Sequence, residues 1–501
     1  MKKYEFVIVG GGTAGMITAA VFSKKWGDLA NVTVIYDHKN PGIGVGESLT
    51  PNIYDFLDYM GISRNDMIKN VNATVKLGLK FKNWLNDGNY FYHNFNQRPL
   101  SKYKQTVGGI IPIVSAYDIV NNEYDNDFTY SSNFMENCKI PKDHSLSQSL
   151  HIDATLFSKY IENILRDKIT VIDGIVKDAN NTGEHINSVV LEDGRVIKGD
   201  FFIDATGFKK LLFKKITDDW VDKTDWLPLD RCIPNPIPWE FKTQPPYTTS
   251  EATDQGWILQ VPLSNRWGTG YLYSSKFLSD DIAFENFQKF LNKNYGENTL
   301  NNKSKVLSFE SGYWRKQWVG NCMAIGLSSG FAEPLEATNI MHVIAQVSYF
   351  VETFNFKIFN YDITRYNQKM ISFYESIYLY LRFCYTTNRT DSAFWEYMTN
   401  NTPREVKDLE DKVKFDILTN MQELSNMVPF SFENHIRVAN GLKKINVKSW
   451  EEQLKRKDVK FAKNLSQQVK RDKLNDYVQS VDHLDYVQTI LSTTKYTKLL
   501  F

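Results

Sequence analysis

The sequence predicts an α/β protein with a parallel, doubly wound sheet, and three segments carry this prediction. The apolar run Phe6–Val9 ends in the glycine-rich turn 10–15, after which apolar residues recur at helical spacing. A second apolar run, 32–36, closes a strand–helix–strand unit of about 30 residues. A third strand and turn, 199–207, lies far along the chain. A sheet assembled from such distant segments indicates a discontinuous module.

The turn 10–15 has the Gly-x-Gly-x-x-Gly spacing of a Rossmann-like dinucleotide-binding loop. Glycines at these places allow a tight turn and a close approach of the backbone to a pyrophosphate, which lies at the N-terminus of the following helix. The predicted cofactor contacts in this turn are Gly10, Gly12, Thr13, Ala14 and Gly15.

The ribose of a bound dinucleotide usually meets an acidic residue at the end of the second strand. Tyr36 has that place in this chain, and Asp37 follows it. Asp37 is therefore the predicted ribose ligand, displaced by one residue, and a solvent-facing loop aspartate is the alternative.

A second glycine-rich segment, 42–48, has glycines at alternate positions, which would let backbone amides approach a flat ring. A flexible loop is the alternative interpretation. Together with the turn 10–15 and the strand 199–207, the order of motifs resembles that of the glutathione-reductase-like flavoproteins, which use these segments for FAD. By this resemblance the flavin contacts include Gly44, Val45, Gly46, Glu47 and Asp204.

Composition and charge argue against several classes of protein. The 59 Lys and Arg residues nearly balance the 58 Asp and Glu residues, so no global field would attract nucleic acid or an anionic membrane. No segment approaches the roughly 20 apolar residues that a membrane span needs. The four cysteines lie far apart, without a C-x-x-C pair. We therefore expect a cytoplasmic protein that binds neither a metal, nor nucleic acid, nor a membrane.

Four segments are expected along the chain. Residues 1–217 would form the first part of the FAD-binding module, and residues 301–355 its return. Between them, residues 218–300 begin rich in Trp and Pro and would form a mixed, substrate-side segment. Helical patterns dominate residues 356–501, which indicates a helical substrate module at the C-terminal end.

Two amphipathic helices are expected to pack on the sheet. Thr50 followed by Pro51 resembles an N-cap with proline at the first helical position, and Asp153 precedes a second apolar stripe in the same way.

Three segments resemble the flavin-dependent halogenases related to the tryptophan halogenases. Residues 326–339 read GLSSGFAEPLEATN, similar to the family's GLSSGFVEPLESTG signature. Residues 74–84 are similar to the stretch around the family's catalytic lysine. Residues 256–263 resemble its Trp-x-Trp-x-Ile-Pro motif, but Leu259 replaces the second tryptophan and Val261 the isoleucine.

This resemblance spans roughly residues 4–345 and implies an oxidoreductase that uses FAD as FADH2. In the family, reduced flavin and oxygen oxidise a bound halide (chloride, bromide or iodide) to hypohalous acid, which attacks an electron-rich aromatic substrate of phenol or indole type. By matching positions, Lys76 directs the hypohalous acid, and Glu336 stabilises the cationic intermediate and helps remove its proton. No second nucleotide-binding motif is visible, so a separate flavin reductase would supply FADH2. A homo-oligomer is compatible with the sequence.

The resemblance also assigns a halide site. The turn at Thr338 and Asn339 would open a helix, Ile340–Phe350, whose N-terminal amides favour an anion. A plain helix cap is the alternative, and the family has glycine at the Asn339 position. Gly326 and Leu327 complete the predicted FAD contacts. Leu327 stands where NADPH-dependent aromatic hydroxylases carry an aspartate, which argues against that class.

Without the resemblance, Lys76 would be interpreted as a solvated lysine. Strand alternation places it on one polar face with Lys80 and Lys82, while Leu77, Leu79 and Phe81 point inward.

The expected substrate is an aromatic compound other than free tryptophan. An ammonium and a carboxylate need partners when they are buried, and no segment of the C-terminal half matches those of the tryptophan-specific members. The aromatic-rich stretch 373–385 would stack a neutral ring, with ordinary core packing as the alternative. The competing functions are a single-component FAD monooxygenase and a non-catalytic flavin-binding protein.

Overall fold

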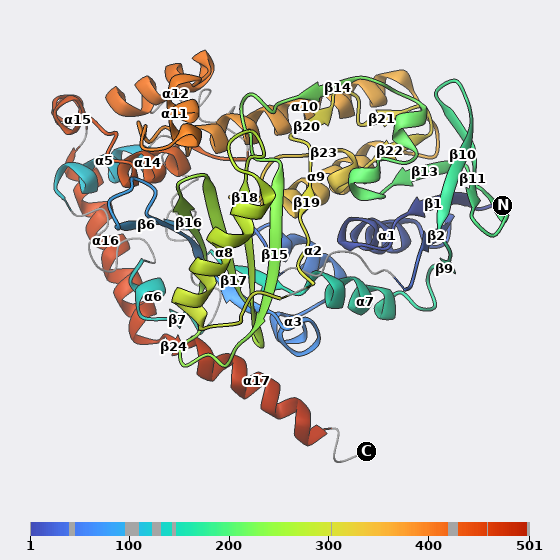
Figure 1. Ribbon diagram of the computed structural model, residues 1–501, viewed down its shortest axis with the longest axis horizontal. Coiled ribbons are helices and arrows are strands. Elements are labelled where there is room, and N and C mark those ends of the chain that lie inside the picture. Colours follow the sequence, from blue (N-terminus) through green and yellow to red (C-terminus); the bar gives the residue numbers. More distant parts are fainter. Residues whose placement is uncertain are drawn as a thin grey trace. The chain divides into compact units, whose positions relative to one another are not determined.

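The computed structural model divides into two compact units. Figure 1 labels the helices and strands of the chain. The first contains residues 1–73, 152–230 and 308–375, and the second contains residues 74–151, 231–307 and 376–501. Within these limits the structure describes residues 2–39, 46–95, 110–122, 132–142, 147–301, 303–418, 429–457 and 459–497.

The first unit is built on a six-stranded sheet. Its order is β21 (Trp318–Val319), β22 (Cys322–Ala324), β13 (Phe201–Asp204), β1 (Tyr4–Val9), β2 (Ala30–Tyr36), β9 (Thr170–Asp173). All neighbours are parallel except β21 with β22. Val9 is in register with both Asp204 and Ile35, so the carboxyl ends of the three central strands meet at one edge. The three predicted strands are confirmed.

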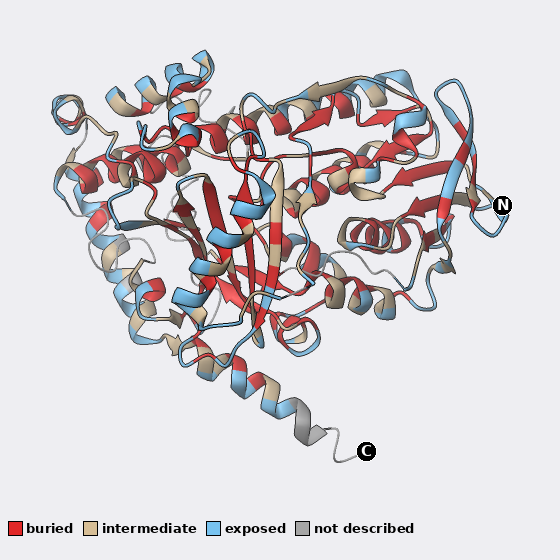
Figure 2. Ribbon diagram, in the orientation of Figure 1, coloured by how far each residue is buried: buried red, intermediate tan, exposed pale blue. Residues whose placement is uncertain are grey.

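Both faces of this sheet are covered, so its strands need apolar residues on both sides. On one face lie α1 (Thr13–Trp26) and α9 (Thr338–Thr353), where Phe6 stacks on Trp26 and Phe22 on Phe350. On the other lies a small antiparallel sheet, whose strands are β10 (Val176–Thr182), β11 (His185–Leu191) and β12 (Val196–Lys198). Figure 2 shows β1 and β13 mostly in the colour of buried residues.

The remaining elements of the first unit surround this core. They include α2 (Ile53–Met60), α3 (Arg64–Val71), α7 (Ala154–Ile164) and the sheet of β14 (Trp220–Asp222), β20 (Gly312–Trp314) and β23 (Gly330–Phe331). Asp153 caps α7 as predicted, because its carboxylate accepts a hydrogen bond from the Leu156 amide at 3.0 Å. The predicted cap at Thr50 is wrong: α2 begins two residues later with Asn52 as N-cap, and the Thr50 hydroxyl donates to the Asn52 side chain.

The second unit is built on a mostly antiparallel sheet. Its order is β19 (Leu307–Ser308), β15 (Arg231–Pro238), β18 (Arg266–Tyr273), β17 (Gly256–Pro262), β16 (Tyr247–Thr253), β5 (Gly78–Lys82), β6 (Tyr90–Asn94). β16 and β5 pair in parallel. Helix α8 (Asp280–Tyr295) covers one face, where Phe287 and Leu291 join a core cluster with Tyr271 and Tyr273.

Helices make up most of the C-terminal part, as predicted. They are α10 (Asn360–Phe383), α11 (Ala393–Asn400), α12 (Arg404–Phe415), α14 (Phe432–Gly441), α15 (Val447–Leu454), α16 (Val459–Val478) and α17 (His483–Thr497). Earlier in the chain come α5 (Ile110–Val120) and α6 (Ser132–Glu136), and two short pairings, β4 (Thr74–Lys76) with β8 (Ser149–Ile152) and β7 (Lys139–Ile140) with β24 (Val481–Asp482).

The two units do not follow the four segments expected from the sequence. Residues 74–151 belong to the second unit, whereas the sequence-based division placed them within 1–217. The reason is the pairing of β5 with β16, which joins Gly78 to Tyr247 across a long stretch of chain that no local pattern signals. None of the helices in the described ranges is long and apolar enough to span a membrane.

Candidate functional site

The glycine turn after β1 is closely packed on one side and open on the other. Gly10 has a φ of +119°, and a Cβ there would lie 2.2 Å from the Ala205 carbonyl oxygen. A Cβ on Gly15 would lie 1.9 Å from the Gly10 carbonyl oxygen. A Cβ on Gly12 would meet no atom within 4 Å. The open space at Gly12 is where a pyrophosphate would approach the backbone, so the turn fits the dinucleotide predicted for it.

The N-terminus of α1 is suited to an anion. Its N-cap, Gly12, makes no side-chain cap hydrogen bond, and its first turn, which begins with Thr13 and Ala14, contains no acidic residue. The uncapped amides and the helix dipole therefore favour a negative group. Gly326, with a φ of +60°, comes so close that a Cβ there would lie 2.8 Å from the Ala14 Cβ. Segments over 300 residues apart thus meet at the first turn of α1.

The Asp204 carboxylate is hydrogen-bonded to the loop that follows β13. Oδ1 accepts hydrogen bonds from the Thr206 amide and hydroxyl, and Oδ2 accepts from the amides of Leu212 and Phe213. The buried carboxylate holds these residues beside the carboxyl edge of the sheet. Its effect on a bound cofactor would therefore be exerted through the loop.

The return segment of the predicted flavin site follows β22. Gly326–Ser328 form a short 3-10 helix, in which Leu327 is partly buried. The Gly326 amide donates to the Gln346 side chain of α9 at 3.2 Å, so this turn is fixed to the helix behind it.

The second glycine-rich segment is described only from Gly46 onward. Gly44 and Val45 lie outside the described residues. Gly46 is buried, and burial raises the pKa of Glu47 to about 7. Burial thus favours the neutral form of the Glu47 carboxyl more than it does for an ordinary surface glutamate.

A cavity of about 230 Å³ lies between the end of β2 and α7. Asp37, the predicted ribose ligand, is not among the residues that line it. The Asp37 carboxylate accepts a hydrogen bond from the Lys39 amide at 2.9 Å, within its own turn. The lining residues are Gly11, Tyr36, His38, Thr155, Ser158, Lys159 and Glu162.

Lys76, the last residue of β4, is completely buried in the second unit. Its ammonium nitrogen lies 4.8 Å from the centre of the Phe95 ring. Lys80 and Lys82, on β5, are only partly buried. The expectation of a solvated lysine from strand alternation is therefore wrong, because β4 and β5 belong to different sheets and the alternation does not continue through Leu77.

Two buried histidines support the strand that carries Lys76, and sequence reasoning missed both. The His151 ring forms hydrogen bonds with the hydroxyls of Thr74, at 2.9 Å, and Thr248, at 3.0 Å. The His483 Nε2 accepts a hydrogen bond from the Val75 amide at 3.0 Å. Burial first, and then the Lys76 ammonium and His483, hold the pKa of His151 well below its usual range. No local motif marks these histidines, because the pairing of β4 with β8 and the folding back of the C-terminal part bring them here.

Glu336 lies in the first unit, in the loop before α9, and is buried, as is Glu333. The helix begins at Thr338, not at Ile340 as predicted, and extends to Thr353. Its N-cap, Ala337, has a φ of +56° and no side-chain cap hydrogen bond. Thr338 and Asn339 thus belong to the first turn of a helix whose amides lack a side-chain cap, which is a suitable place for a halide.

From residue 376 onward, the aromatic-rich stretch packs in the core of the second unit. Tyr385 accepts a hydrogen bond from the Trp257 indole at 2.9 Å, and its ring centre lies 5.6 Å from Trp84 and 5.8 Å from Trp395. Tyr380 stacks on Phe430 with 3.8 Å between ring centres. These rings contact one another, as the core-packing alternative expected.

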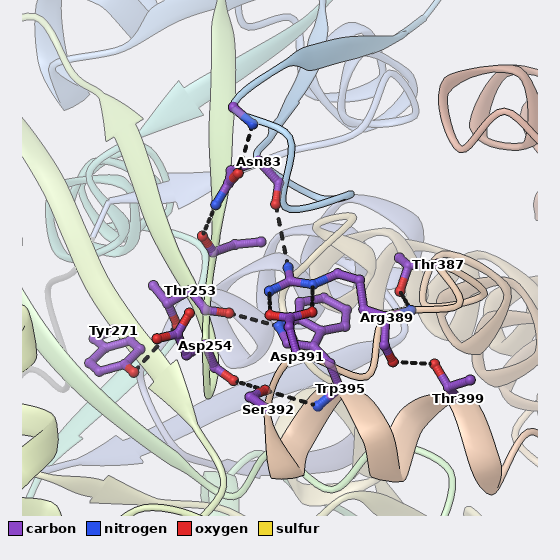
Figure 3. A network of polar contacts seen from close by, with 12 residues as sticks. Asn83, Thr253, Asp254, Tyr271, Thr387, Arg389, Asp391, Ser392, Trp395 and Thr399 are labelled. Atoms are coloured by element: carbon purple, nitrogen blue, oxygen red, sulfur yellow. Dashed lines mark hydrogen bonds and ion pairs between the residues drawn. The ribbon is translucent and has the colours of Figure 1, made fainter.

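A polar network fixes α11 beside this aromatic core (Figure 3). Arg389 forms a two-pronged ion pair with Asp391 and lies 4.1 Å above the Trp395 ring. The Trp395 indole donates to the Thr253 carbonyl at the end of β16, at 2.7 Å. The hydroxyl of Ser392 donates to the Asp254 carbonyl. The start of α11 is thereby attached to the turn between β16 and β17.

The chain is similar to known proteins over most of its length. The sequence model of the tryptophan halogenase family matches residues 5–453. Tryptophan 7-halogenase RebH of Lentzea aerocolonigenes is 30% identical over 427 residues, which are 79% of this chain and 78% of the relative. Tryptophan 7-halogenase KtzQ of Kutzneria sp. is 30% identical over 78% of both chains.

Solved structures show the same fold. The tryptophan 6-halogenase SttH of Streptomyces toxytricini has a TM-score of 0.86, with 23% identity over 97% of this chain and 99% of that one. The flavin-dependent halogenase Xcc4156 of Xanthomonas campestris has a TM-score of 0.85, with 23% identity over 98% and 99%. The predicted FAD-binding α/β fold is confirmed. The chain belongs to the tryptophan halogenase family, whose members are flavin-dependent enzymes that use FADH2 from a reductase and a halide to halogenate an aromatic substrate.

Proposed function

We propose that this enzyme halogenates an indole ring of the tryptophan type, with Lys76 delivering the hypohalous acid. The observation that carries the proposal is the burial of Lys76. A fully buried lysine at the family's catalytic position is a candidate functional residue, because desolvated ionisable groups cluster at functional sites. Its support by β8 and His483 would hold the side chain in one place.

The names of the curated relatives favour an indole over the phenols that the sequence also allowed. Those relatives are tryptophan 6- and 7-halogenases, whereas the sequence alone predicts free tryptophan to be a poor substrate. The aromatic stretch 373–385 does not favour a phenol as the substrate, because the rings of Tyr380 and Tyr385 pack against other aromatic residues of the chain.

Halide binding and proton removal are assigned to the first turn of α9 and to the loop before it. The first turn of α9, at Thr338 and Asn339, would bind the halide through amides that no side chain caps. Glu336 would stabilise the cationic ring after halogen transfer and accept its proton, and a buried carboxylate is suited to both tasks. Bound FADH2 supplies the two electrons with which oxygen and the halide yield hypohalous acid and water.

Substitution of Lys76 tests this proposal. Purified protein would be supplied with FAD, NADH, a flavin reductase, bromide and tryptophan. Lys76→Ala should form no halogenated indole, while oxygen consumption continues and hypohalous acid is still captured by an added thioether trap. Lys80→Ala, a lysine change on β5, the next strand along the chain, is the matched control and should retain product formation. Halogenation by Lys76→Ala at the rate of the unsubstituted protein would exclude Lys76 from the reaction.

A further inference from the structure

The adenosine end of the cofactor site differs from the usual pattern at Tyr36. The second strand of a dinucleotide-binding fold normally ends in a carboxylate that binds the ribose, and here β2 ends in a tyrosine. A Cβ on Gly11 would lie only 2.3 Å from the Tyr36 ring, so this ring covers the glycine turn. The place of the usual carboxylate is thus taken by an aromatic side chain that lines the cavity beside the turn.

A carboxylate reaches the same cavity from another element. Glu162, near the end of α7, accepts a hydrogen bond from the Tyr36 hydroxyl, with 2.6 Å between the phenol oxygen and Oε2. Burial and the Glu162 carboxylate raise the pKa of Tyr36, which keeps the phenol protonated and able to donate. Since the tyrosine uses Oε2, the other carboxylate oxygen can accept a hydrogen bond from a ligand.

The helix that carries Glu162 presents a whole face to the cavity. Thr155, Ser158, Lys159 and Glu162 all line it, and their spacing of three and four residues places them on one side of α7. Asp153 caps this helix and fixes its start. The carboxylate therefore lies on a regular helix, whereas Asp37 lies in a turn where its side chain accepts a hydrogen bond from Lys39.

We propose that Glu162 binds the ribose hydroxyls of FAD in this protein, and that Tyr36 positions its carboxylate through their hydrogen bond. In this proposal α7 has the role that the end of the second strand has in other dinucleotide-binding folds. Glu162 then takes the place of Asp37 as the ribose ligand. The proposal concerns cofactor binding, so it does not depend on the aromatic substrate or on Lys76.

The test compares two ligands that differ only at the ribose. Full-length protein freed of flavin would be titrated with FAD and with an FAD analogue whose adenosine is 2′,3′-dideoxy, and binding followed by flavin fluorescence. The unsubstituted protein should bind the analogue about 10- to 100-fold more weakly than FAD, as expected for lost hydrogen bonds to a charged group. Glu162→Gln should bind FAD more weakly by a similar factor, and should no longer distinguish the two ligands.

Tyr36→Phe tests the positioning role separately. This change keeps the ring over Gly11 and removes the hydroxyl, so it should reduce the preference for FAD over the analogue by a smaller factor than Glu162→Gln. Because Tyr36 acts through Glu162, the double variant should bind FAD no more weakly than Glu162→Gln alone. Additive losses in the double variant would contradict the positioning role.

The control is Glu192→Gln, an exposed carboxylate of the same unit, which should keep both affinities. Halogenation by Glu192→Gln should match that of the unsubstituted protein, whereas Glu162→Gln should need a higher FAD concentration for half-maximal halogenation, which separates a binding defect from a failure of the proposed reaction. The proposal is overturned if Glu162→Gln retains the ribose preference, or if Asp37→Asn removes that preference and Glu162→Gln does not.

Discussion

At the scale of single residues, Lys76 and Glu336 could be proposed as site residues from the sequence, but their surroundings could not be predicted. Both were identified by position in motifs. The burial of Lys76 contradicts the alternation of its segment, because the chain passes from one sheet to another at Leu77. His151 and His483 carry no local signal at all. Their side chains reach β4 only through pairings between distant segments.

Glu336→Gln should lower the turnover number for halogenation by about 10²-fold, because it removes the negative charge and the proton acceptor while it keeps the size of the side chain. Rates would be measured by chromatography of the halogenated product at saturating substrate, and FAD affinity should be unchanged. Glu333→Gln is the matched control, since Glu333 is equally buried in the same loop. A normal turnover number in Glu336→Gln, or a larger loss in Glu333→Gln, would show that the role is assigned to the wrong residue.

Two glycines of the same turn should respond differently to alanine. Gly12 has a φ of −73° and no atom near its Cβ position, so Gly12→Ala should leave the stability of the flavin-free protein unchanged but weaken FAD binding about 10- to 100-fold. Gly15→Ala should instead cost about 1–3 kcal/mol of stability, because its Cβ would collide with the Gly10 carbonyl. Thermal unfolding and fluorescence titration measure the two effects. Equal FAD affinity in Gly12→Ala would show that the pyrophosphate does not approach there.

At the scale of elements, the helices with clear caps were easier to predict than the strand pairings. Asp153 and the apolar stripe behind it located α7, because the signals of a capped amphipathic helix are local. The predicted start of α9, Ile340, lies two residues after its observed start at Thr338. The start has no local signal, because Ala337 adopts a left-handed conformation without a capping side chain. The parallel pairing of β5 with β16 was not predicted, because a pairing between distant strands depends on the complete fold.

Helix α9 should also make stability depend on pH through His342. This buried ring lies 4.1 Å from the Tyr374 ring, and within the described part of the chain neither of its nitrogens has a hydrogen-bond partner. Burial lowers the pKa of His342 to about 3. The unfolded chain therefore binds a proton more readily below about pH 6.5, and the stability contributed by the neutral folded form declines from pH 6.5 toward pH 3.

His342→Phe should remove this dependence and keep an aromatic ring against Tyr374. Between pH 7.5 and pH 5 the unsubstituted protein should lose about 2 kcal/mol more stability than the variant, as a shift of 1.5 pH units below the unfolded pKa implies. Urea unfolding of the flavin-free protein at both pH values measures the difference. The same loss in both proteins would show that His342 is not responsible.

At the scale of the whole molecule, one chain unites a dinucleotide-binding unit with a unit that carries the buried Lys76. The sequence predicted the first unit well, because its glycine turn and strands are continuous local patterns. It did not predict the contact between Tyr36 and Glu162, because the two residues lie more than 100 positions apart in the chain. Membership of the tryptophan halogenase family links both units to one chemistry.

The most direct test of the proposed halogenation is mass spectrometry of the products formed by the purified protein with FAD, NADH, a flavin reductase, oxygen and either chloride or bromide. Tryptophan, other indoles and a phenol panel would be supplied separately. We expect an indole product with the isotope pattern of the halide supplied, no product without halide, and lower catalytic efficiency for phenols. A hydroxylated product formed at the same rate without halide would contradict the account, because it would identify a monooxygenase.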